Sequence, residues 1–255
     1  MPSLNRHTRP EATLVEPRHG GVSADIRRGV TAGIPIAIGY VPIAIAFGLL
    51  AKSSGLPNWV GMAMSFFVFA GASQFVGVNL LVLGAGFGEI VLTTLILNFR
   101  HFLMSAALSQ RLETNVTKKW LALIAFGVTD ETFGVSALRS EAKLAKGFVL
   151  GLNVIAYTAW NAGTWIGLFI AEGLPEALKN SMGIALYAMF IGLLLPSMKR
   201  SREVMTIALL AAAIHALLRW LPIFAGLSAG WTIIIATVLS AAAGAAIFTK
   251  EANRS

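Results

Sequence analysis

The sequence predicts an all-α integral membrane protein with seven or eight transmembrane helices. Of its 255 residues, 56% are hydrophobic and only 13% are charged, whereas about a quarter of the residues in a soluble domain are charged. The mean hydropathy is +0.73. Long apolar runs recur along the chain, and a membrane-spanning helix needs about 20 such residues. Strands are not expected, because these runs are too long and continuous for a membrane β-barrel.

The apolar runs follow a polar N-terminal tail. Residues 1–24 contain prolines and no hydrophobic signal-peptide core, so we expect a disordered cytoplasmic tail there. Residues 25–250 are expected to form the transmembrane domain. The candidate segments are 29–51, 58–85, 88–109, 119–138, 147–171, 180–197, 203–221 and 229–249. The last two could instead form a single hairpin.

Basic residues predict that both chain ends lie on the cytoplasmic side. Arg27 and Arg28 precede the first apolar segment, and KRSR at 199–202 and the C-terminal end are also basic. The acidic or neutral loop at 171–180 is expected outside. The basic loop at 111–119 conflicts with eight simple crossings, which would place it outside. Either the charge rule fails there, or one segment before this loop and one after it are re-entrant.

Two segments carry polar residues at mid-length and are expected to be broken helices. Segment 58–85 contains GASQF, and segment 119–138 contains TDET. In GASQF the small Gly71 and Ala72 stand beside Ser73 and Gln74, and such a sequence permits an unwound turn. The backbone groups of that turn could hold a carboxylate and an ammonium. The alternative is ordinary packing of small residues.

Two segments carry polar or aromatic residues at helical spacing, which places each set on one helix face. In segment 88–109 the stripe consists of Thr94, Asn98, His101 and Ser105. In segment 147–171 it consists of Asn153, Tyr157, Trp160 and Thr164, with Asn161 at its border. A single polar residue would indicate only a hydrogen bond between helices. Two matched stripes favour a polar cavity or pathway through the membrane.

Arg100 is the only formal charge between Glu89 and Arg111. A charge at mid-membrane costs about 3 kcal/mol or more unless it is paired or hydrated. Helical geometry places Arg100 on the side away from the polar stripe. Its expected partner is Asp130 or Glu131, the acids that lie within an apolar run. This group could be a structural ion pair or could take part in moving protons or substrate.

Several functional classes are disfavoured by composition. The chain has no Cys and only four His, so we expect no Cys nucleophile, no metal site and no other cofactor. The net charge of +8 is explained by topology signals without nucleic acid. An intramembrane hydrolase using a pair such as Ser73–His101 remains formally open. A channel or a non-transporting membrane subunit is a third class.

One sequence echo suggests an internal repeat. Gly33 precedes GLP at 55–57 by 22 residues, and Gly151 precedes GLP at 173–175 by the same 22. Transporters often contain internal repeats. Whether such a repeat is parallel or inverted is open from the sequence.

Four stretches together resemble the AzlC family, the large subunit of branched-chain amino-acid exporters. They are GIPIAIGYVPIAIAFGLLAKSSG, MSFFVFAGASQF, ILNFRHFLMSAAL and VTDETF, in this order. The resemblance is dense over 29–139 and weaker to about residue 248. It implies export of leucine, isoleucine, valine or sometimes methionine across the plasma membrane, with a small AzlD-like membrane subunit as partner. The motif residues are Gly71–Gln74, Asn98, Arg100, His101, Asp130 and Glu131.

The energy source follows from the residues. The chain contains no GxxxxGK[ST] loop, so it is not expected to hydrolyse ATP. An ion gradient is therefore expected, and protons are favoured because one His and two acids lie at membrane depth. The residues thus favour a secondary-active, proton-coupled transporter rather than an enzyme, and the resemblance implies that it is an exporter.

Overall fold

The computed structural model describes residues 21–114, 116–170, 173, 175, 191–192 and 194–252. Within these ranges the fold is helical and contains no strand, which confirms the predicted class. The elements are α1 Gly21–Ser53, α2 Asn58–Ala63, the π-helix η1 Met64–Val68, α3 Gly71–Val82, α4 Phe87–Arg111, α5 Lys118–Phe126, α6 Asp130–Ala137, α7 Lys146–Ile170, α9 Arg202–Trp220, the 3₁₀ helix η3 Pro222–Phe224 and α10 Ala229–Ala252. Most of the predicted tail and of segment 180–197 lies outside the described residues.

Four helices are long and apolar enough to cross a membrane, among the described residues: α1, α4, α9 and α10. Helix α7 has 25 residues as well, but the polar residues along its length make it less apolar. Helix α1 begins at Gly21, so residues 21–24 belong to a helix and not to the predicted tail.

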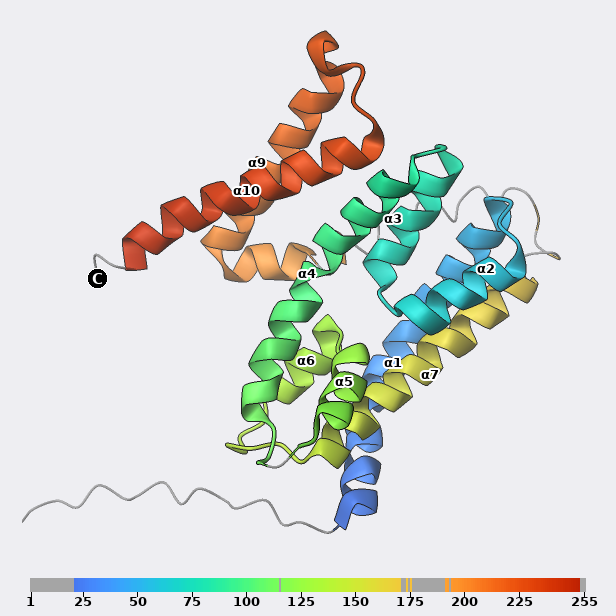
Figure 1. Cartoon of the computed structure of the whole chain (residues 1–255), viewed down its shortest axis with the longest axis vertical. Helices are drawn as coiled ribbons and strands as arrows, with labels where there is room; N and C mark the ends of the chain where they lie inside the picture. Colours follow the sequence, from blue (N-terminus) through green and yellow to red (C-terminus); the bar gives the residue numbers. More distant parts are fainter. Residues whose placement is uncertain are drawn as a thin grey trace, which may run out of the picture.

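Helices α1 and α7 pack side by side and run in the same direction (Figure 1). Glycines allow the two backbones to touch. A Cβ added to Gly29 would lie 2.0 Å from the Phe148 carbonyl oxygen, and one added to Gly167 would lie 2.2 Å from that of Ile45. These are the close contacts expected of small-residue helix pairs in membranes. The two helices that contain Gly33 and Gly151 are therefore parallel. The internal repeat itself stays a prediction.

Segment 58–85 folds back on itself. Helix α2 and η1 run along the C-terminal half of α7, with Gly61 against Leu168. The chain then breaks at Phe69, which adopts left-handed backbone angles (φ 46°). Helix α3 returns beside η1, where Gln74 Nε2 donates to Ser65 Oγ at 2.9 Å. The expected break is confirmed, and it lies immediately before GASQF. We call α2, η1 and α3 the first hairpin.

Segment 119–138 forms a second hairpin, made of α5 and α6, that enters from the opposite end. Helix α5 begins near the start of α7, where Lys146 lies over the Trp120 ring. The chain breaks after α5, and Thr129 caps α6 by accepting a hydrogen bond from the Thr132 N–H. Helix α6 ends beside the last residue of α4, because Arg111 Nη1 donates to the Ala137 carbonyl at 2.8 Å. The predicted break at TDET is thus confirmed.

The two hairpins change the number of crossings. Segments 58–85 and 119–138 each turn back at mid-length, so the expected count of seven or eight crossings is not confirmed. Helix α4 runs opposite to α1 and ends near the start of α7 (Figure 1). The basic loop at 111–119 therefore lies at the same end of the molecule as the start of α1. This agrees with the re-entrant alternative for that loop.

Helices α9 and α10 form a separate helical pair that packs on α4 (Figure 1). The side chain of Glu89, in the first turn of α4, holds the start of α10. Its Oε1 accepts from Ser228 Oγ at 2.5 Å and from the Gly230 N–H at 2.7 Å. With 19 and 24 residues, the two helices are two spans in length rather than one short hairpin.

Candidate functional site

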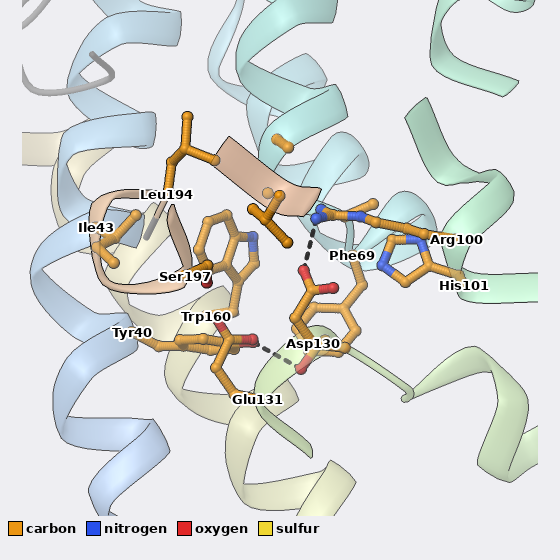
Figure 2. A pocket seen from close by; sticks show the side chains of 15 residues that line it. Tyr40, Ile43, Phe69, Arg100, His101, Asp130, Glu131, Trp160, Leu194 and Ser197 are labelled. Carbon is orange, nitrogen blue, oxygen red and sulfur yellow. Dashed lines mark hydrogen bonds and ion pairs between the residues drawn. The ribbon is translucent and has the colours of Figure 1, made fainter. Parts of the chain in front are cut away.

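A cavity of about 690 Å³ lies where the breaks of the two hairpins meet, at mid-length of α1 and α7 (Figure 2). Every element around it contributes side chains. The lining residues are Tyr40, Ile43, Phe69, Ala70, Gly71, Ala72, Arg100, His101, Thr129, Asp130, Glu131, Trp160, Leu194, Ser197 and Val204. Seven of the residues predicted from the sequence are therefore in one place: Gly71, Ala72, Arg100, His101, Asp130, Glu131 and Trp160.

Arg100 and Asp130 form the predicted ion pair, which joins α4 to the start of α6. Arg100 Nη1 lies 2.7 Å from Asp130 Oδ2. The two side chains are 44% and 46% exposed, so the pair is not sealed in protein. One expectation was wrong: Arg100 does not point away from His101, since both line the cavity. Adjacent helix positions differ by about 100°, and a cavity this wide spans both directions.

Glu131 is held by Tyr40, and no cation pairs with it among the described residues. The Tyr40 hydroxyl is hydrogen-bonded to Glu131 Oε2 and lies 2.7 Å from Thr129 Oγ1. Tyr40 is itself buried, at 7% exposure. Reasoning from the sequence missed Tyr40. The available signal was a tyrosine hydroxyl in the middle of an otherwise apolar helix, where it requires a partner.

Gln74 supports the first hairpin from behind the cavity. Its side chain is fully buried, and its Oε1 accepts from Trp160 Nε1 at 3.0 Å and from the Ala70 N–H at 3.2 Å. Ser73 donates to the Ala70 carbonyl at 2.9 Å. Both residues were predicted to line the pathway, and the structure does not place them on the cavity wall. A broken helix leaves backbone groups unpaired, and these side chains pair them.

The start of α3 faces the cavity without a side-chain cap. Gly71 packs on the face of Trp160, because an added Cβ would lie 2.7 Å from the ring. The first N–H groups of a helix lack intrahelical partners and carry partial positive charge. The wall formed by Gly71 and Ala72 therefore suits an anionic group.

The stripe on α7 holds the hairpins instead of lining a polar pathway. Asn153 Nδ2 donates to the Ile124 carbonyl at 2.9 Å, and the Tyr157 hydroxyl donates to the Phe66 carbonyl at 2.9 Å. Asn161 donates to the carbonyl of Tyr157 on its own helix. Only Trp160 of this stripe reaches the cavity. Helix ends inside the membrane domain expose carbonyls, and α7 supplies their donors.

The stripe on α4 is also divided. His101 lines the main cavity, whereas Ser105 lines a separate cavity of about 100 Å³. Asn98 does not line the main cavity, and its buried Oδ1 has no hydrogen-bond partner among the residues that the structure describes. Thr94 donates to the Ile90 carbonyl of its own helix at 2.8 Å. Of the residues on the two predicted stripes, His101 and Trp160 line the main cavity, and Asn98 does not.

The cavity is chemically two-sided (Figure 2). Charged and hydroxyl groups from α1, α4 and the second break gather on one part of its wall. The apolar side chains of Ile43 and Leu194 lie on another part, and the Phe69 ring lies beside Asp130 (Figure 2). Such a site can hold a small molecule with a charged head and an aliphatic body, since ligand pockets combine an apolar lining with a few placed polar groups.

Comparisons with known proteins give the family. The chain matches the AzlC protein family over residues 35–174. It is 32% identical to the inner membrane protein YgaZ of Escherichia coli (strain K12), over 80% of this chain and 85% of that protein.

Two further relatives match a smaller share of this chain. A membrane protein of Archaeoglobus fulgidus is 33% identical over 69% of this chain and 78% of its own length. The branched-chain amino acid transport protein AzlC of Bacillus subtilis (strain 168) is 29% identical over 65% of this chain and 62% of its own length. No solved structure matches. The match to the family and the relation to YgaZ show that this chain belongs to the AzlC family of membrane proteins.

Proposed function

We propose that this chain is the large subunit of a secondary-active exporter of branched-chain amino acids in the plasma membrane. The observation that carries the proposal is the two-sided cavity at the junction of the hairpins. A zwitterionic amino acid has opposite charges on one end and, in leucine, isoleucine or valine, an aliphatic chain on the other. The charged and apolar parts of the wall are arranged for that combination.

The size and lining of the cavity support this substrate class. Its volume of about 690 Å³ falls in the range of about 300–1,000 Å³ usual for small-molecule sites. The α3 start and Arg100 are suited to the substrate carboxylate, and Ile43 and Phe69 to its aliphatic chain. The name of the Bacillus subtilis relative, a branched-chain amino acid transport protein, gives the same substrate class.

The two hairpins suggest how the site is exposed to each side in turn. The first hairpin enters from the end where α1 and α7 finish, and the second from the end where they start. Both breaks contribute to one cavity. Broken helices around a midplane site are a recurrent device of alternating access in transporters. Movement of one hairpin would open the cavity to one side while the other hairpin keeps it closed.

Proton coupling and the partner complete the proposal. His101, Asp130 and Glu131 are titratable groups on the cavity wall, and the sequence has no nucleotide-binding loop. We propose an inward proton gradient as the energy source. The N-terminus is on the cytoplasmic side, and a small AzlD-like membrane subunit is needed for activity.

The test is amino-acid efflux from cells preloaded with leucine-containing dipeptides. Cells without the chain, with the chain, and with the chain and its small partner are compared. Leucine efflux is expected to rise with the pair and to collapse when a protonophore removes the proton gradient. Efflux equal to that of cells without the chain would contradict the exporter. Efflux that continues unchanged with the protonophore would contradict proton coupling alone.

A further inference from the structure

The charges on the cavity wall do not balance one another. Arg100 pairs with Asp130 at 2.7 Å. Glu131 has no cationic partner among the described residues, and its hydrogen bond is to the neutral Tyr40 hydroxyl. His101 and Tyr40 are the other titratable groups on the wall. The cavity therefore presents one carboxylate that no arginine or lysine in the described part of the chain neutralises.

We infer that Glu131 binds the substrate's α-ammonium group and thereby excludes 2-oxo acids that carry the same aliphatic side chain. This inference rests on the proposed function for the identity of the substrate, and it assigns the selection to one residue. The motif pairs two adjacent acids, and the structure separates their surroundings: Asp130 meets Arg100, and Glu131 meets Tyr40.

The geometry of Glu131 leaves a free acceptor. Oε2 is engaged by Tyr40, while Oε1 makes no hydrogen bond with the described residues. Tyr40 is bonded to Thr129 as well, which fixes the side of the carboxylate that remains open to the cavity. An ammonium has three donors and no acceptor, so it complements a carboxylate oxygen without competing with Tyr40.

A 2-oxo acid meets this wall unfavourably. It replaces the ammonium with a carbonyl oxygen, which cannot donate to Glu131, and its net negative charge is repelled by the same carboxylate. A lost hydrogen bond to a charged group lowers affinity by roughly 10- to 150-fold. Rejection through an unpaired polar group is a stronger means of discrimination than a change in aliphatic shape.

The experiment compares leucine with its 2-oxo analogue, 4-methyl-2-oxopentanoate, by equilibrium binding to the full-length chain in lipid nanodiscs. The variants are Glu131→Gln, Tyr40→Phe and a control, Glu203→Gln, whose side chain is exposed in the first turn of α9. Wild type and the control are expected to prefer leucine by roughly 100-fold.

Glu131→Gln is expected to weaken the binding of leucine and to strengthen the binding of the 2-oxo acid. Removal of the charge abolishes both the attraction of the ammonium and the repulsion of the 2-oxo acid. The preference should fall below about tenfold. Tyr40→Phe should weaken the binding of leucine without strengthening the binding of the 2-oxo acid. A gain of binding cannot result from misfolding, so it separates the inference from a structural defect.

Three results would overturn the inference. In the first, wild type binds leucine and Glu131→Gln keeps the wild-type preference, with or without an equal loss of affinity for both ligands; the proposed function would then stand without this residue role. If wild type binds both ligands equally, selection by Glu131 is contradicted. If wild type binds neither ligand, both this selection and the proposed substrate are contradicted.

Discussion

At the scale of single residues, the Arg100–Asp130 pair joins two elements without being sealed in protein. Breaking a fully buried ion pair costs about 3–5 kcal/mol, and an exposed pair contributes about 0–1 kcal/mol. Both side chains are nearly half exposed. We therefore expect the pair to contribute a stabilising free energy between these two values. Removal of only one of the two charges should still have a measurable effect, because the other charge is left without its partner.

Arg100→Met alone should lower the free energy of unfolding of the purified chain by about 1–3 kcal/mol, because it leaves Asp130 and Glu131 as adjacent acids without a cationic partner. The double variant Arg100→Met with Asp130→Asn should recover much of that loss. Unfolding followed by intrinsic fluorescence in detergent measures both. Equal stability of the single variant and wild type would show that the pair does not hold α4 to α6.

At the scale of elements, the second hairpin depends on Arg111. Its guanidinium donates to four carbonyls at and after the end of α6, those of Ser136, Ala137, Arg139 and Glu141, at 2.7–3.0 Å. Basic side chains commonly satisfy the last carbonyls of a helix. Here one side chain from α4 ends α6 and attaches the chain that follows it.

Arg111→Met is expected to destabilise α6 locally by about 1–3 kcal/mol, since three part-buried carbonyls and one exposed carbonyl lose a charged donor. Hydrogen exchange of residues 130–141 should accelerate roughly tenfold or more. The matched control is Lys143→Met, which removes a single exposed bond to the Gln110 carbonyl and should leave these rates close to wild type. Unchanged exchange in Arg111→Met would mean that α6 does not need this attachment.

The elements also show what could be predicted from the sequence. The breaks in segments 58–85 and 119–138 were predictable, because polar and small residues interrupt long apolar runs. The length of those runs did not show whether each segment folds back on itself, because it suits either one span or two half-helices. Only the basic loop at 111–119 favoured the re-entrant alternative.

The polar stripes were misassigned for a related reason. Spacing indicates which residues share a face but not what that face meets. Asn153 and Tyr157 meet backbone carbonyls exposed by the hairpin breaks, and such carbonyls exist only once the breaks have formed. The Arg100–Asp130 pairing was predictable, because charges at membrane depth need partners and few were available.

At the scale of the whole molecule, the hairpins fix which loops share a side. The sequence contains no cysteine, so single cysteines can report topology directly. Cysteines introduced at Ser3 and Thr114 should be protected from an impermeant thiol reagent in intact cells. A cysteine at Ala85, between α3 and α4, should be labelled. Labelling of Thr114 with protection of Ala85 would contradict the two hairpins, because eight simple crossings predict that pattern.

The central claim is that the cavity between the hairpin breaks is the amino-acid site, and alkylation of Ala72→Cys tests it most directly. Ala72 lines the main cavity. Its matched control is Ser105→Cys, on the separate cavity of about 100 Å³. Saturating leucine should slow alkylation at position 72 by roughly tenfold or more, since a bound ligand excludes the reagent, and leave position 105 unchanged. Equal alkylation rates at position 72 with and without leucine would contradict the account.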